Sequence, residues 1–191
     1  MNLILASRSP RRRELLGLTG LDFTVRVADI DETMDETKPP VEEVARVSRE
    51  KAMAVSREPD DVVIAADTIV VCEGKVLGKP RDAEDAFRML SLLSGRNHQV
   101  MTSMTVLRGD ELVTHTEVTS LRFRKLHPEE IRAYIATGEP MDKAGAYGIQ
   151  GGAALFCTRM EGDYYNVMGL PVCALTVILR TFGLPIWGVS V

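Results

Sequence analysis

An almost unbroken apolar run from Val62 to Cys72 constrains the fold of this chain more than any other segment. A run of this kind, without polar alternation, is typical of strands buried on both faces, which occur in sheets covered by helices. Apolar positions at helical spacing precede it at 41–57, and a helical pattern follows it at 82–93. Strands and helices alternate throughout, so the sequence predicts an α/β fold with a mixed sheet.

Capping and turn signals place the remaining elements. Ser9 and Pro10 match an N-cap followed by the first helical position, and Gly109-Asp110 matches the turn of a hairpin. The acidic stretch 29–40 and the glycine-rich stretch 138–152 are expected to be loops. Further strands are predicted at 3–6, 23–28, 98–107, 112–123 and 153–158, and further helices at 10–18, 128–136 and 172–182.

Length and composition limit the class of protein. The chain has 191 residues, without repeats or linkers, and this predicts one domain over residues 1–191. A net charge of -4 and 5% aromatic residues argue against nucleic-acid binding. No apolar stretch approaches the ~20 residues of a membrane span, and the basic N-terminus does not match a signal peptide. Three widely spaced cysteines are each expected to be buried hydrophobes, and their spacing favours the cytoplasm.

Arginines crowd the first turn of the helix expected at 10–18. The segment Ser7-Arg8-Ser9-Pro10-Arg11-Arg12-Arg13 puts them at a helix end that already carries about half a positive charge. Free backbone N–H groups beside arginine side chains suit a phosphate. The alternative is a solvated basic helix start that Glu14 partly offsets. The segment is not a Walker A loop, because the glycines and the Gly-Lys-Ser/Thr of that motif are missing.

Asp67 and Thr68 interrupt the apolar run 62–72. A carboxylate in such a run must leave the core, bind partners or accept a large desolvation penalty. Strand ends of α/β sheets are where such groups meet ligands, and perturbed acids in clefts are often catalytic or metal-binding. Asp67 is therefore a candidate for one of these roles. The alternative is an aspartate that bonds its own turn with the help of Thr68.

Three further charged residues are candidates for a site. Lys51 falls on the apolar stripe of the helix expected at 41–57, so it either reaches an anion or extends to solvent. Lys79 follows the same strand region as Asp67 and either binds an anion or is a plain turn lysine. Glu32 either shares a magnesium ion with Asp67 or is only solvated. The scattered histidines lack zinc-motif spacing, and the glycine-rich stretch lacks the dinucleotide fingerprint.

Several segments together form an ordered set of motifs. They are Ala6-Ser7-x-Ser9-Pro10-Arg11-Arg12, Ala66-Asp67-Thr68, Gly78-Lys79-Pro80, Leu93-Ser94-Gly95, Asp142-Lys143-Ala144-Gly145-Ala146-Tyr147-Gly148-Ile149-Gln150-Gly151 and Gly169-Leu170-Pro171. This set resembles the Maf (septum-formation-inhibitor-like) nucleotide pyrophosphatases from residue 3 to about residue 183, leaving 184–191 as a C-terminal tail. The long motif is similar to the branch that hydrolyses dTTP and UTP, because the 7-methyl-GTP branch carries a glutamate at the position of Gln150.

The resemblance implies a fold and a reaction. The fold would be elongated and two-lobed, similar to inosine triphosphatase, with a central mixed sheet flanked by helices, a cleft between the lobes and a homodimeric assembly. The reaction would cut the α–β phosphoanhydride of dTTP and UTP, with modified pyrimidine triphosphates as further candidates. The products would be the monophosphate and pyrophosphate, and the cofactor a divalent cation, Mg or Mn.

The resemblance also implies roles for individual residues. Asp67 matches the position of the proton acceptor and general base, and together with Glu32 it is the expected metal ligand. The expected contacts to substrate phosphates are Ser7, Ser9, Arg11, Arg12, Lys51 and Lys79. The positions that choose the base are Arg11, Thr68 and Gln150. A side-chain amide at Gln150 suits uracil or thymine, since it offers both a donor and an acceptor to the edge of the ring.

A second hypothesis is a non-catalytic nucleotide-binding regulator of cell division or septum formation. The presence of Asp67 and Glu32 beside basic groups disfavours it, because a pure anion binder gains little from acids.

Overall fold

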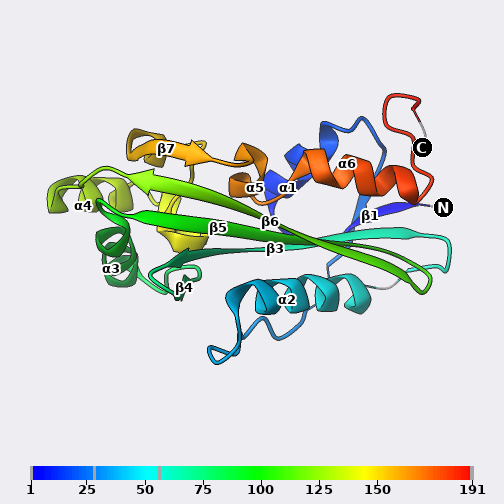
Figure 1. Ribbon diagram of the computed structural model, residues 1–191, viewed down its shortest axis with the longest axis horizontal. Helices are drawn as coiled ribbons and strands as arrows, with labels where there is room; N and C mark the ends of the chain where they lie inside the picture. The colour runs from blue at the N-terminus through cyan, green and yellow to red at the C-terminus, as the bar shows by residue number, and fades with distance from the viewer. Residues whose placement is uncertain (1, 28, 56, 190–191) are drawn as a thin grey trace. The chain divides into compact units, whose positions relative to one another are not determined.

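The computed structural model describes residues 2–27, 29–55 and 57–189, and Figure 1 draws its helices and strands, with most of them labelled. Over these residues, seven strands form one mixed sheet in the order β2-β1-β3-β5-β6-β7, with β4 paired to β3. The predicted α/β class is therefore confirmed. Contacts divide the chain into two compact units, which are Met1–Asp67, Thr102–Glu117 and Gly169–Val191 in the first and Thr68–Met101 and Val118–Met168 in the second.

The first unit is built around the N-terminal parallel strands. Strand β1 pairs in parallel with β2 and with β3, and Leu5 lies opposite Ile64. The apolar run forms the single long strand β3, buried along almost its whole length, as its composition predicts. Helices and strands that lie wholly in this unit are β1 (Leu3–Leu5), α1 (Pro10–Gly17), β2 (Thr24–Val25), α2 (Pro40–Ala54) and α6 (Val172–Thr181). Three strands contribute to both units, β3 (Val62–Cys72), β5 (Asn97–Arg108) and β6 (Glu111–Phe123).

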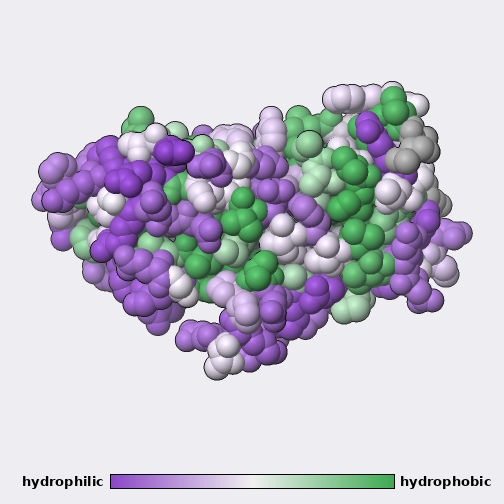
Figure 2. Space-filling model, viewed as in Figure 1, coloured by the Kyte–Doolittle hydropathy of each residue, from purple (hydrophilic) through white to green (hydrophobic). Residues whose placement is uncertain are grey.

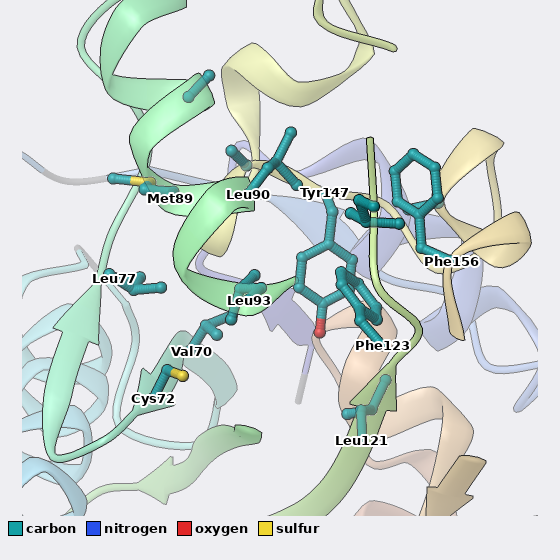
Figure 3. Packing of buried hydrophobic residues seen from close by; sticks show 14 of the residues in the cluster. Val70, Cys72, Leu77, Met89, Leu90, Leu93, Leu121, Phe123, Tyr147 and Phe156 are labelled. Carbon is teal, nitrogen blue, oxygen red and sulfur yellow. The ribbon is translucent and has the colours of Figure 1, made fainter. Parts of the chain in front are cut away.

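The second unit packs helices and short turns around its own core. Its strands and α-helices are β4 (Lys75–Leu77), α3 (Ala83–Leu93), α4 (Pro128–Ala136), β7 (Cys157–Glu161) and α5 (Tyr164–Met168). The glycine-rich stretch folds into three 3₁₀ turns, η1 (Glu139–Asp142), η2 (Ala144–Ala146) and η3 (Gly152–Leu155). Figure 3 shows the ring of Tyr147 among Leu93 of α3 and Phe123 of β6, and all three belong to one buried cluster. Over α3 and α4, the surface in Figure 2 is mostly hydrophilic.

Two strand predictions are corrected. The strand expected at 153–158 begins only at Cys157, because the N–H groups of Ala154 and Phe156 bond to carbonyls three residues earlier and close the turn η3. The strand expected at 23–28 covers only Thr24–Val25, and Ala28 lies outside the described residues. Among the described strands it lies at the edge of the sheet, beside β1.

The cysteine prediction holds only in part. Cys72 is buried in the core of the second unit, whereas Cys157 is half-buried and Cys173 is exposed on α6. No helix in the described ranges is long and apolar enough to cross a membrane.

Candidate active site

The loop between β1 and α1 is organised by two serine hydroxyls. Ser9 is the N-cap of α1, and its side chain accepts a hydrogen bond from the backbone N–H of Arg12 at 3.4 Å. The hydroxyl of Ser7, which is buried, accepts from the backbone N–H of Ser9 at 3.1 Å. Pro10 begins the helix, as its fixed φ favours. The predicted cap is confirmed, and the arginines lie in a first helical turn that contains no acid.

Arg12 is held in place by main chain and hydroxyl groups of the first unit. Its Nε donates to the carbonyl of Gly169 at 2.8 Å, and Nη1 donates to the Ser7 hydroxyl at 3.4 Å. Burial lowers the pKa of Arg12 from its ordinary value, while the charges of Asp67 and Glu32 oppose this shift. The guanidinium therefore lies in the field of two carboxylates. Gly169 was noted in the sequence only as a motif residue, and its contact with Arg12 had no sequence signal.

Asp67 and Lys51 form a mostly buried ion pair in the first unit. The Nζ of Lys51 lies 2.7 Å from Oδ1 of Asp67 and 2.9 Å from Oε2 of Glu32. The side chains of Asp67 and Lys51 are 12% and 13% exposed, and that of Glu32 is 57% exposed. Asp67 lies within β3 and pairs with Lys51, so the alternative of a turn aspartate is wrong. Lys51 does not extend into solvent; it joins the two predicted acids.

Helix α2 also fixes the acidic loop that carries Glu32. Arg46 donates from Nη2 to the carbonyl of Thr33 at 2.8 Å, and Glu43 accepts from the backbone N–H of Asp35 at 2.9 Å. Glu43 and Arg46 are themselves paired, one helical turn apart, at 2.9 Å. The loop is therefore anchored at two points beside Glu32 by the helix that carries Lys51. The sequence signal for this pair is the three-residue spacing of Glu43 and Arg46 within the helical pattern.

The other predicted residues lie in the second unit. Thr68 is half-buried on β3, next in sequence to Asp67, while Lys79 and Gln150 are exposed. The backbone N–H of Gly145 donates to the carbonyl of Gly78 at 3.0 Å. This bond joins the Gly78-Lys79-Pro80 turn to the start of the segment that carries Gln150.

The acidic pair is a suitable donor set for a hard divalent cation. Asp67 and Glu32 direct carboxylate oxygens at one positive group, the Lys51 ammonium, and oxygen donors are what Mg²⁺ and Mn²⁺ prefer. In the described part of the chain, no group of three histidine, cysteine or acidic side chains could hold a metal by itself. An ion here would keep waters or take substrate oxygens, as Mg²⁺ usually does.

These features define an α/β protein whose first unit gathers an arginine-rich, capped helix start and a mostly buried acid paired with a lysine. The helix start and the lysine suit a phosphate-bearing anion, and the acid adds a group that can take a proton or bind a cation. Residues 2–182 match the family model described as Maf-like protein, and the chain belongs to this family. It is 52% identical to a dTTP/UTP pyrophosphatase from Moorella thermoacetica over 190 residues, and this alignment covers 97% of each chain. It is 47% identical to a dTTP/UTP pyrophosphatase from Bacillus pumilus, over 95% of this chain and 97% of the relative.

A solved structure shares the fold at low sequence identity. It is a HAM1 protein from Coxiella burnetii, with a TM-score of 0.51 and 14% identity over 95% of this chain and 99% of that one.

Proposed function

We propose that this chain is a nucleoside triphosphate pyrophosphatase that hydrolyses dTTP and UTP at the α–β phosphoanhydride. Relatives about half identical over nearly the whole chain carry the name dTTP/UTP pyrophosphatase. The observation that carries the proposal is the Asp67–Lys51 pair at 2.7 Å, because it puts a mostly buried carboxylate beside a cation. A base next to groups that neutralise phosphate charge is what phosphoanhydride hydrolysis requires.

Asp67 has the role of general base in this proposal. It accepts a proton from the water that attacks the α-phosphorus, and the bridging oxygen leaves with pyrophosphate. The nucleoside monophosphate is the second product. The carboxylate of Glu32 pairs with the same Lys51 ammonium, and Glu32 is the second acidic residue of the proposed site.

The basic groups bind the triphosphate. Arg11, Arg12 and Lys51 of the first unit contribute positive charge, and the hydroxyls of Ser7 and Ser9 add donors. Lys79 of the second unit is a further proposed phosphate ligand. Arg12 is already oriented by Gly169 and Ser7, so less conformational entropy is lost when it binds an anion.

A divalent cation, when bound to Asp67 and Glu32, supplies charge neutralisation for the triphosphate. Both side chains provide oxygen donors, which supports this part of the proposal. We also propose that the protein acts in the cytoplasm as a homodimer and does not bind nucleic acid. Modified pyrimidine triphosphates are proposed as further substrates of the same reaction.

A nucleotide panel tests the proposal. The protein is incubated with dTTP, UTP, CTP, ATP and GTP in the presence of Mg²⁺ or Mn²⁺, and pyrophosphate is measured. Release of pyrophosphate from dTTP and UTP is the expected result. Binding of these nucleotides without turnover under either metal would instead identify a nucleotide-binding regulator.

Gln150→Glu is expected to lower kcat/KM for dTTP and UTP by about 100-fold, since a site built to hydrogen-bond one base rejects a mismatched partner strongly. A carboxylate offers acceptors only and repels the carbonyl oxygens of the pyrimidine. The measurement is kcat/KM for the five triphosphates on both proteins, with Gln99→Glu, an exposed glutamine of the same unit, as control. An unchanged order of substrates would mean that other groups choose the base.

Arg12→Ala is expected to lower kcat/KM for dTTP by about 10- to 100-fold, because a charge-assisted bond to phosphate is lost. Arg13→Ala removes an exposed neighbour on the same helix and is the matched control. The melting temperature of each variant reports the structural effect of losing the bond to Gly169, whereas kcat/KM reports the loss of the phosphate contact. A loss of melting temperature without a kinetic change would show that Arg12 is only structural.

A further inference from the structure

The segment around Gln150 is held on both sides by one pair of side chains in the second unit. The backbone N–H of Gly148 donates to the hydroxyl oxygen of Tyr134 at 3.0 Å, and that hydroxyl donates to Oε1 of Glu139 at 2.8 Å. The other carboxylate oxygen, Oε2, accepts from the backbone N–H of Gly152 at 3.0 Å. The chain of hydrogen bonds therefore closes a ring around Gln150, two residues from each anchored glycine.

The glycines of this segment are required by close approach to the same pair. A Cβ added at Gly151 would lie 2.1 Å from Oε1 of Glu139, and one at Gly152 would lie 3.0 Å from Cε2 of Tyr134. A Cβ at Gly148 would lie 2.8 Å from Cε of Lys143 and 3.0 Å from Oε1 of Glu139. The backbone thus runs directly against the carboxylate and the ring, so its position depends on theirs.

Tyr134 and Glu139 are themselves anchored. Tyr134 is a buried residue of α4, and its ring packs edge to face on Phe156 with centroids 5.2 Å apart. The carbonyl of Glu139, in the turn η1 that follows, accepts from Nζ of Lys143 at 2.6 Å. Burial raises the pKa of Tyr134 above its ordinary value, so its hydroxyl keeps the proton that it donates to Glu139. Neither residue belongs to the phosphate or acid groups described above.

We infer that Tyr134 and Glu139 are positioning residues for base selection, which fix the backbone on both sides of Gln150. The inference rests on the proposed function and on the proposed role of Gln150 in it. Gln150 is exposed, and an exposed amide can discriminate between pyrimidine edges only if its backbone is held in one place. The hydrogen bonds of Tyr134 and Glu139 supply that restraint. They act on the segment without touching the substrate.

Tyr134→Phe tests the inference with a minimal change. It removes one oxygen, retains the ring on Phe156, and leaves Gly148 without its acceptor. Small displacements away from the chemistry cost up to about 10²-fold, so kcat/KM for dTTP relative to CTP should fall about 10- to 100-fold. Tyr164→Phe makes the same chemical change at an exposed tyrosine of the same unit and should leave the ratio unchanged.

Two further measurements identify the route of the effect. In a Gln150→Ala background, Tyr134→Phe should cause no additional loss in the dTTP to CTP ratio, because the residue through which it acts is gone. Hydrogen exchange of the amides at Gly148 and Gly152 should accelerate in Tyr134→Phe and not in Tyr164→Phe. Glu139→Gln retains one side-chain oxygen that accepts hydrogen bonds. Its kcat/KM ratio for dTTP relative to CTP should therefore lie between those of the wild type and Tyr134→Phe.

Other outcomes overturn the inference in distinguishable ways. A Tyr134→Phe variant that melts earlier but keeps the wild-type ratio would show a purely structural role. A loss that persists in full in the Gln150→Ala background would show that Tyr134 acts by another route. A wild type that releases pyrophosphate without preferring dTTP and UTP over CTP would remove the inference and leave the pyrophosphatase reaction standing. A wild type that hydrolyses no triphosphate would overturn the proposed function as well.

Discussion

Asp67→Asn should leave the fold intact and reduce triphosphate hydrolysis by about 10²- to 10⁴-fold, the usual contribution of a general base. The amide has nearly the same shape as the carboxylate and can still accept a hydrogen bond from Lys51 through its oxygen. It cannot take a proton from water, and it is a poor ligand for a hard cation. The loss should therefore appear mainly in kcat.

The measurement is kcat and KM for dTTP and UTP at saturating Mg²⁺, together with thermal melting. Asp60→Asn, an exposed aspartate of the same unit, is the matched control and should match the wild type. Lys51 keeps Glu32 as an ion-pair partner in Asp67→Asn, so only a modest change in melting temperature is expected. Activity within a few-fold of the wild type would remove Asp67 from the mechanism.

The fold class and most elements followed from local sequence patterns. The apolar run 62–72 predicted a doubly buried strand, and Ser9 before Pro10 predicted the start of α1. These signals are local, since periodicity and capping depend on residues a few positions apart. The strand at 153–158 was placed wrongly at its start, because Ala154 and Phe156 close the turn η3. The bond from the Gly152 N–H to Glu139, 13 residues away, is one that no local pattern shows.

The identity of the candidate residues could be predicted better than their partners. Lys51 on an apolar helical stripe left two hypotheses open, and the structure distinguishes them by its bonds to Asp67 and Glu32. The bond from Arg12 to Gly169 joins residues 157 positions apart, and such a contact depends on tertiary packing. Sequence spacing carries no information about a backbone carbonyl at that distance in the chain.

Lys51→Ala should lower kcat/KM for dTTP and UTP by about 10- to 100-fold, as expected for a lost hydrogen bond between charged groups. Two effects contribute. The triphosphate loses a cation, which raises KM. Asp67, mostly buried, also loses the ammonium that lies 2.7 Å from it, and removal of one partner from a buried pair is destabilising.

Two substitutions separate these effects. Lys51→Met keeps the apolar stem on the helix and removes only the charge, so it should share the kinetic loss of the alanine variant while packing better. Lys51→Arg keeps the charge but changes its geometry, and should recover stability more fully than kcat. Lys125→Ala, at an exposed lysine, should behave as the wild type in both assays. If Lys51→Ala and Lys51→Met both lower the melting temperature and leave kcat and KM unchanged, the lysine neutralises the acids in the folded protein and takes no part in binding the substrate.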